Sequence, residues 1–451
     1  MSSDVAIIGF GFGGLMVLAN LVRHAQAPCS VTVFAEDTRG TGLAYGTTNT
    51  LHLLNVPARN MSAFPQESGH FLSWLATKEA EAARQSLGLK TLPGADDFSP
   101  RALYAHYLAS IRRTALDEAQ QKNIAVQFIP AAVEQLVPAD GGWQITAGAQ
   151  QLSAQRVVIA TGHEVKPVFA ALAHEAIIEN PWSLMAEDAL AFGHRPVVMI
   201  GTGLTSVDMV LSLRRMGYHG VVHMISRNGL LPLPHKPVTM PYVLDADALL
   251  AQPNLLAVLR YVRGAIRTHA RAGGDWRAVI DALRPYATTL WQKLNARDQR
   301  SFIRRLATVW NIHRHRMAPD IAAILQQEIA TGKVKLAASQ HFNPSIEDGK
   351  LKLAVQWREH GQEILHPAAI MNCTGPELNW ARSKRPLLQQ LLQQNHVVAH
   401  ATRMGVVADN QYRIGTQLYA IGNPMIGQFW ESTAVPELRV QATTLAEVLC
   451  P

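Results

Sequence analysis

Two glycine-rich runs contain the residue types that hold the phosphates of a dinucleotide. The first, Gly9-Phe10-Gly11-Phe12-Gly13-Gly14, matches the G-x-G-x-x-G pattern, and Glu36 follows where a carboxylate can accept hydrogen bonds from an adenosine ribose. In this pattern Gly9 allows the tight turn, Gly11 lets the backbone approach a pyrophosphate, and Gly14 lets a helix pack closely on a strand. The run therefore predicts cofactor binding.

The second run, Gly201-Thr202-Gly203-Leu204-Thr205-Ser206, has a serine where the third glycine would stand. Its unit ends in Arg227, whereas the first unit ends in an acid. A guanidinium suits a 2′-phosphate, which favours NADPH over NADH; the alternative is a surface arginine at a strand end. The residues predicted to bind this cofactor are Gly201, Gly203, Thr205, Ser206 and Arg227.

The segments around both runs have the order that a Rossmann unit requires. Residues 5–8 form an apolar stretch of strand length, residues 15–22 have helical character, and residues 30–35 form a β-branched strand. The same order recurs in residues 196–200, 207–216 and 221–225. In each unit the helix N-terminus would present free N–H groups and its positive dipole end to the phosphates.

Each unit is followed by short strands and a buried strand that ends in Thr-Gly. The first of these endings is Thr161-Gly162, and the second is Thr374-Gly375. We therefore predict an α/β fold with two interleaved Rossmann-like dinucleotide-binding domains, a glutathione-reductase-like tandem. The FAD-binding domain would comprise 1–195 and a return segment 371–451. The NADPH-binding domain would comprise 196–370, with a helical insertion at about 246–332.

The return segment is expected to complete the FAD site. A strand ends at Gly422-Asn423, and the run from Trp430 to Pro436, which includes Thr433, leads into a helix reaching Leu449. The N-terminus of that helix could place its positive dipole end at the flavin pyrimidine ring. The predicted FAD contacts are thus Gly9, Gly11, Gly14, Glu36, Thr161, Gly162, Gly422, Asn423, Trp430 and Thr433. Trp430 is either a wall of the flavin pocket or only an anchor at the helix start.

Composition excludes several classes of protein. A chain of 451 residues with 48% hydrophobic and 17% charged residues is globular, and no apolar run reaches the roughly 18 residues of a membrane span. The N-terminal apolar run lacks a basic leader and is better explained as a strand, so a cytoplasmic protein is expected. The three cysteines, Cys29, Cys373 and Cys450, form no C-x-x-C pair, which predicts neither a disulfide framework nor a metal site.

Positive charge is concentrated between residues 260 and 316, which carry more of it than the net +7 of the chain. Two explanations remain open: a solvated helical face, and attraction of an anionic cofactor or substrate. The aromatic residues there look like helix-packing residues, so nucleic acid is not expected. The basic residues are Arg260, Arg263, Arg267, Arg271, Arg277, Arg284, Lys293, Arg297, Arg300, Arg304, Arg305, Arg314 and Arg316.

Two dinucleotide sites imply hydride transfer from NADPH to FAD. The chain lacks a redox cysteine pair and cysteine ligands for a metal cluster, so oxygen is the favoured electron acceptor. A flavin C4a-(hydro)peroxide would then hydroxylate a small polar substrate. A quinone, a protein partner and simple peroxide formation stay open. The rival classes are a flavin reductase or electron-transfer protein without oxygen insertion, and a redox-sensing binding protein.

Few side chains are candidates for the chemistry itself. Asn55 is the predicted catalytic residue near the flavin ring, and its alternative is a turn-capping role before Val56-Pro57. His52 is expected to be structural, and His163 either faces a site at a strand end or faces solvent. The run 313–316, His-Arg-His-Arg, is either a basic helix end or a site for an anionic substrate such as urate.

Several longer runs resemble a bacterial FAD/NAD(P)-binding protein family that is mostly uncharacterised. They are residues 42–45, 53–57, 61–62, 226–232, 313–319 and 430–439. Members with assigned activities are single-component flavin monooxygenases, among them a FAD-dependent urate hydroxylase and amino-acid N-hydroxylases. The resemblance implies FAD, NAD(P)H and oxygen, with a small-molecule substrate and no membrane partner; a homodimer stays open. The leading specific prediction is hydroxylation of urate to 5-hydroxyisourate, and the alternative is N-hydroxylation of an amino acid.

Overall fold

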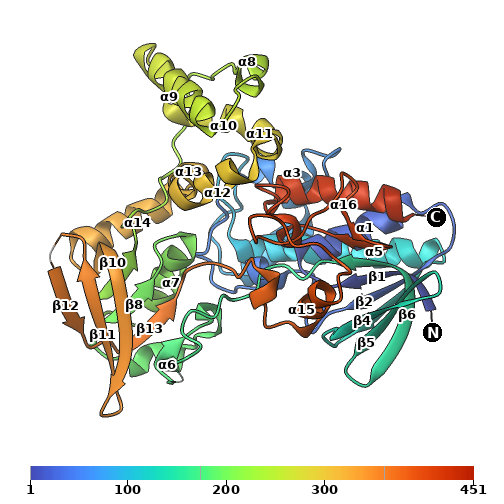
Figure 1. The fold of residues 1–451 in the computed structure, drawn as a ribbon, viewed down its shortest axis with the longest axis horizontal. Coiled ribbons are helices and arrows are strands. Elements are labelled where there is room, and N and C mark those ends of the chain that lie inside the picture. Colours follow the sequence, from blue (N-terminus) through green and yellow to red (C-terminus); the bar gives the residue numbers. More distant parts are fainter. Residues whose placement is uncertain (1, 173, 360, 451) are drawn as a thin grey trace.

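The computed structural model describes residues 2–172, 174–359 and 361–450, which form two sheets lying side by side (Figure 1). The first sheet has the strand order β14-β15-β6-β1-β2-β3, and the β4–β5 hairpin extends β6. Its central pairs, β1 with β2 and β1 with β6, are parallel. The strands are β1 (Ser2–Ile8), β2 (Ser30–Phe34), β3 (Ala125–Ile129), β4 (Gln135–Ala139), β5 (Gly142–Ala147), β6 (Gln150–Ile159), β14 (Arg413–Gly415) and β15 (Leu418–Ala420).

The second sheet has the order β12-β11-β10-β9-β8-β13-β7. Its core of β8, β9 and β13 is parallel, whereas β10, β11 and β12 pair antiparallel at one edge. The strands are β7 (Ile177–Ile178), β8 (Val197–Ile200), β9 (Val222–Ser226), β10 (Val334–Glu347), β11 (Lys350–Trp357), β12 (Gly361–Leu365) and β13 (Ala369–Asn372).

Helices α1 (Phe12–His24), α5 (Arg101–Gln121) and α16 (Val435–Leu449) pack together on one face of the first sheet. Their apolar side chains share one core with β1 and β2, in which Leu15, Leu108 and Leu445 are fully buried. The second half of β1, residues 5–8, is entirely apolar and buried, as expected for a central parallel strand that is covered on both faces.

Helices α7 (Leu204–Arg215) and α14 (Pro319–Ala330) belong to the core of the second sheet. Pro319 begins α14 and Gly332, with φ +73°, follows its end, which is the usual placement of proline and glycine at the two ends of a helix. The predicted insertion extends to residue 332, but α14 packs in the core of the second sheet. This helix therefore belongs to the domain itself.

The insertion proper consists of helices between residues 246 and 314 and projects from the body (Figure 1). Its outer part has a small core of its own around Leu249, Ile280 and Leu283. The helices are α8 (Ala246–Leu250), α9 (Leu255–Arg271), α10 (Trp276–Leu283), η3 (Arg284–Tyr286), α11 (Ala287–Lys293), α12 (Ala296–Arg305) and α13 (Ala307–Arg314).

The remaining elements are short and lie mostly in connections. Residues 70–86 form two helices, and Thr77 between them accepts a hydrogen bond from the Ala80 N–H and caps the second one. These elements are α2 (Gly42–Tyr45), η1 (Ala58–Asn60), α3 (His70–Leu75), α4 (Lys78–Ser86), η2 (Pro181–Ser183), α6 (Ala186–Ala191), η4 (Trp380–Arg382), α15 (Pro386–Gln393) and η5 (Asn423–Met425).

Both predicted domain boundaries need correction. Strand β7 pairs in parallel with β13 of the second sheet, so the chain enters the second domain before residue 177 and not at 196. The boundary at 370/371 cuts through β13. A two-residue strand has no hydrophobic periodicity of its own, and its place is set only by its hydrogen bonds to β13. Within the described residues, no helix combines the length and the apolar character needed to cross a membrane.

Candidate functional site

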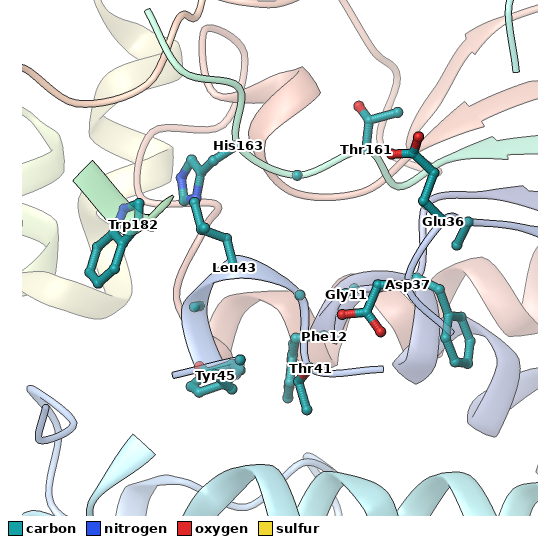
Figure 2. Close-up of a pocket in the computed structure, with 18 of the residues that line it drawn as sticks. Gly11, Phe12, Glu36, Asp37, Thr41, Leu43, Tyr45, Thr161, His163 and Trp182 are labelled. Carbon is teal, nitrogen blue, oxygen red and sulfur yellow. The ribbon is translucent and has the colours of Figure 1, made fainter. Parts of the chain in front are cut away.

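A cavity of about 1120 Å³ lies at the carboxyl ends of β1, β2 and β6, where open α/β sheets bind their ligands. Its walls come from the first domain, on both sides of the first glycine turn, and from one side of the second domain. Figure 2 shows Glu36 and Thr161 at one end and His163 and Trp182 at the other. Among the predicted FAD contacts, the lining includes Gly9, Gly11, Glu36, Thr161, Gly162, Gly422, Asn423 and Thr433.

Two glycines of the first turn are required by the fold itself. Gly9 has φ +100°, and a Cβ there would lie 2.5 Å from the Ala160 carbonyl oxygen. A Cβ on Gly14 would lie 2.1 Å from the Gly9 carbonyl oxygen, so helix and turn could not pack. A Cβ on Gly11 would meet only Gly42 at 3.5 Å, an ordinary contact. The open space at Gly11 is therefore space that a ligand can use.

The chain around the turn offers polar groups that its own fold leaves unpaired. Helix α1 starts after Gly11 without a side-chain cap and without an acid in its first turn, so its N–H groups stay free. The Thr41 hydroxyl and the Asn423 amide oxygen are buried, have no hydrogen-bond partner, and belong to residues that line the cavity. Buried polar atoms are normally hydrogen-bonded, so these orphaned atoms fit a polar ligand such as FAD.

Arg385 is a lining residue that the sequence analysis missed. It precedes α15, and its guanidinium donates hydrogen bonds to the Thr161 and His163 carbonyl oxygens at 2.8 and 3.0 Å. Desolvation lowers its pKa, and the charges of Glu164 and Glu36 oppose that shift. Arg385 therefore fixes the segment after β6 and brings a cation to the Glu36 end of the cavity. An Arg-Pro pair at a helix start was its only local signal.

At the other end, the cavity is bounded by apolar side chains from both domains: Leu43, Trp182, Leu184, Met209 and Met216. His163 lies beside Leu43 with its ring open to the cavity (Figure 2). The protein around the ring desolvates it, and together with Arg385 this lowers the pKa of His163. Its neutral form, which can accept a proton, is thus favoured at neutral pH. His163 thus lines the cavity and is also exposed to solvent, so it fits both sequence alternatives.

His52 joins the two domains. Its Nδ1 lies 2.9 Å from the Thr47 hydroxyl, and its Nε2 lies 2.8 Å from the Ser212 hydroxyl of α7. Burial lowers the pKa of His52, which keeps the ring neutral among these partners. Beside it, the partly buried Arg101 of α5 forms an ion pair with the buried Asp208 of α7 at 2.9 Å. We call these contacts the domain latch; they give His52 the structural role that the sequence favoured.

Asn55 is not among the cavity-lining residues. Its backbone carbonyl accepts a hydrogen bond from His235 Nε2 at 3.0 Å, which draws this part of the loop onto the second domain. The catalytic role assigned to Asn55 thus stays a prediction that this geometry does not support.

The second glycine turn repeats the backbone of the first one. Gly201 has φ +120°, and a Cβ there would lie 2.2 Å from the Cys373 carbonyl oxygen. The Ser206 hydroxyl donates to the Gly201 carbonyl oxygen at 2.7 Å, so this side chain braces the turn and does not face a ligand.

The other predicted NADPH contacts are not part of the large cavity. A Cβ at Gly203 would meet nothing within 4 Å, and Arg227 is exposed. The Thr202 hydroxyl donates to the Leu230 carbonyl oxygen at 2.6 Å and ties the 226–230 loop to the turn. Gly201, Gly203, Thr205, Ser206 and Arg227 do not line the large cavity.

Trp430 packs against the insertion and does not line the cavity. Its ring lies 4.9 Å from that of Trp291 and 5.3 Å from that of Phe302. Of the two roles considered from the sequence, the helix-start anchor is the one that these contacts fit. Within the described run from Trp430 to Pro436, the cavity is lined by Thr433 alone, and Leu438 in the first turn of α16 follows it.

The next residue, Glu431, has φ +72° and a buried carboxylate that joins the return segment to α13. Trp310 Nε1 donates to it at 2.7 Å, and Arg314 lies 3.1 Å away. Burial opposes ionisation, but His315, Arg314 and Trp310 together lower the pKa of Glu431 to about 2. Arg316 pairs with Asp281. The His-Arg-His-Arg run thus supports structure, and none of it lines the cavity. No cluster of metal-ligating side chains occurs among the described residues.

Comparisons with known proteins agree with this architecture. Residues 6–164 match a family model described as FAD-NAD(P)-binding. No curated protein matches the sequence. Among solved structures, the chain is similar over its full length to the ornithine hydroxylase PvdA from Pseudomonas aeruginosa (15% identity, TM-score 0.64, 100% of this chain and 99% of that chain).

Two further structures share the fold. One is DfoA bound to FAD, the cadaverine monooxygenase from Erwinia amylovora (13% identity, TM-score 0.63, 100% and 94% of the two chains). The other is the bacillithiol disulfide reductase from Staphylococcus aureus (10% identity, TM-score 0.54, 100% and 98%). At these identities the likeness shows the fold alone. It confirms the predicted tandem of dinucleotide-binding domains, a fold that serves both monooxygenases and reductases.

Proposed function

We propose that the protein is an FAD- and NADPH-dependent monooxygenase that hydroxylates an amino group of a small amine, such as an amino acid or a diamine. The single observation that carries this is the large cavity, which contains a glycine turn, a free helix N-terminus and orphaned polar atoms suited to FAD. The likeness to an ornithine hydroxylase and a cadaverine monooxygenase supports the choice of substrate class.

The cysteines argue against the reductase alternative. None of the three cysteines lines the cavity, and Cys373 is buried outside the lining. Burial raises the pKa of the Cys373 thiol to about 12, which disfavours the reactive thiolate. Among the described residues, no cysteine pair suited to dithiol–disulfide exchange therefore lies at the cavity.

When bound, FAD would supply the hydride and oxygen chemistry, and the protein would hold and enclose it. Gly11, Thr41 and Asn423 would hold the cofactor, and Glu36 would accept hydrogen bonds from its ribose. The apolar end around Trp182 and Met209 would exclude water. His163, neutral and open to that end, would accept a proton from the ammonium group of the substrate, because only a neutral amine is nucleophilic.

The second turn would receive NADPH, with Arg227 opposite the 2′-phosphate. Ser206 and Thr202 would act indirectly, since one braces the turn and the other holds the adjacent loop. Urate, the leading substrate in the sequence analysis, has no support from the comparisons, and an amine fits them better.

The test is oxygen and NADPH consumption by the purified flavin-loaded protein with L-ornithine, L-lysine, cadaverine and urate in parallel. The proposal predicts that one amine accelerates both rates in equal amounts and yields a hydroxylamine with little peroxide. Acceleration by urate alone would restore the original substrate. Electron transfer to an added dye or quinone, with no amine accelerating oxygen use, would establish the reductase instead.

A substitution then tests the proton role. His163→Asn should lower kcat for the amine while NADPH oxidation without substrate stays unchanged. Because the role requires neutral imidazole, activity of the wild type should rise with pH through the pKa of His163 and lose this step in the variant.

A further inference from the structure

Helix α9 of the insertion carries a row of arginines on one side. Arg260, Arg263, Arg267 and Arg271 are spaced by three, four and four residues, which places them on one helical face. At 1.5 Å per residue the row is about 16 Å long. All four side chains are exposed, and the helix projects from the body of the molecule (Figure 1). We call this row the α9 arginine face.

Nothing in the described part of the chain neutralises this face, because none of its four guanidinium groups has an ion-pair or hydrogen-bond partner there. Two acids of the insertion are already engaged: Asp275 pairs with Arg277, and the Asp298 carboxylate accepts a hydrogen bond from the Leu255 N–H at the start of α9. Like charges three and four residues apart destabilise a helix. The row thus weakens α9 without a compensating contact inside the protein.

The face also serves neither the cavity nor the core. None of its arginines lines the cavity, which removes attraction of the resident cofactor as an explanation. The opposite side of α9, with Val258, Val262 and Ile266, packs on the core around Leu249 and Ile280. The arginines therefore point toward whatever lies outside the chain.

The chemistry of the face selects among partners. A helix that lies on a membrane must bury its apolar side in lipid, and the apolar side of α9 is already covered by the insertion. Single-stranded nucleic acid would need stacking aromatics, and the row contains none. Arginine in place of lysine favours forked pairing with carboxylates or phosphates, so the choice between these two depends on the other features of the face. Leu256, 54% exposed at the start of the same face, adds an apolar contact of the kind found at protein interfaces.

We propose that the α9 arginine face docks an acidic helix of a partner protein, whose carboxylates repeat the same spacing of three and four residues. Two such helices packed side by side lie 8–10 Å apart, roughly the reach of an arginine–carboxylate pair. This inference goes beyond the proposed function and does not depend on it.

The test uses two synthetic helical peptides with the same number of glutamates, measured against the flavin-loaded protein by fluorescence anisotropy. In one peptide the glutamates follow the spacing of the arginine face; in the other they are scattered around the helix. The patterned peptide should bind about tenfold more tightly, and the gap should shrink at high salt.

A variant with Arg260→Gln, Arg263→Gln, Arg267→Gln and Arg271→Gln should lose the preference while its NADPH oxidation is unchanged. The matched control removes four exposed arginines from α12 (Arg297→Gln, Arg300→Gln, Arg304→Gln, Arg305→Gln) and should keep it. Replacing the four α9 arginines with lysine should retain weak binding but lose most of the preference, because the forked pairing is gone.

Equal affinity for both peptides, or an equal loss of the preference in the α12 control, would show that the face binds through unspecific charge alone. Either result would overturn the proposal. Tighter binding to phosphatidylglycerol vesicles or to duplex DNA, abolished by the α9 substitutions, would overturn the choice of a protein partner.

Discussion

The turns at Gly9 and Gly201 follow the same backbone path but differ in what lies above them. Their φ angles are +100° and +120°, and in both a Cβ would strike the carbonyl oxygen at the end of a neighbouring strand. The first turn opens on a large cavity with orphaned polar atoms. At the second, Thr202 holds the 226–230 loop close, and Arg227 stays in solvent. The same backbone conformation thus occurs at an enclosed site and at an exposed one. An enclosed site suits a tightly held cofactor, and an exposed site suits an exchangeable one.

The largest effect should come from changing the first glycine of each turn. Gly9→Ala and Gly201→Ala each place a Cβ against backbone at positive φ, and each should lower the free energy of unfolding by about 3 kcal/mol or more. Flavin content and thermal unfolding measure the outcome. Only Gly9→Ala should lose flavin from the protein that remains folded. Equal flavin loss in both variants would contradict the assignment of FAD to the first turn.

The next largest effect concerns Arg227. Arg227→Ala should raise KM for NADPH by about tenfold to a hundredfold, because a charge-assisted contact to the 2′-phosphate is lost, and should leave KM for NADH nearly unchanged. Arg227→Lys is the matched control and should recover part of the loss. The same increase for both nucleotides would show that Arg227 is only a surface residue at a strand end.

Two threonines sharpen the contrast between the turns. Thr41→Val removes a buried hydroxyl without a partner, so the flavin-free protein should be as stable as wild type or more so, and flavin affinity should fall about tenfold. Thr202→Val breaks a made hydrogen bond and should cost about 1 kcal/mol of stability, with flavin affinity intact. Flavin titration of both variants decides; unaltered flavin affinity in Thr41→Val would refute its contact with the cofactor.

The smallest effect should be at the third position of the second turn. Ser206→Ala removes one hydrogen bond to Gly201 and should lower the unfolding free energy by about 1 kcal/mol, with KM for NADPH changed less than twofold. Chemical denaturation and steady-state kinetics measure the two quantities. A large change in KM would mean that the hydroxyl meets the nucleotide directly.

The parts of the fold that the sequence predicted well are those determined by local sterics. The two glycine turns, the flanking strands and the helix starts follow from neighbouring residues, and the structure has both turns with the expected positive φ at Gly9 and Gly201. Strand β7 was missed because two residues carry no periodicity, and its position depends on β13, far away in sequence.

The site was predicted less completely because its far end is built from long-range contacts. Asn55 sits near the cofactor unit in sequence, but His235 and the domain latch draw its loop to the other domain. Trp430 precedes a cavity-lining turn, yet the insertion provides Trp291 for it to pack against. Arg385 reaches the cavity from a helix start with no motif. In each case the position of the side chain depends on contacts with residues far away in the sequence and not on its near neighbours.

The domain latch has a consequence for how electrons would travel. A hinge rotation between the two sheets would have to separate Arg101 from Asp208 and His52 from Ser212, leaving buried polar groups without partners. These contacts therefore favour the arrangement of the two domains seen here over a rotated one. The domain latch thus opposes a change in the distance between the two nucleotide turns. If the domains do not rotate, the nicotinamide of a bound donor would have to reach the flavin by its own length and by diffusion.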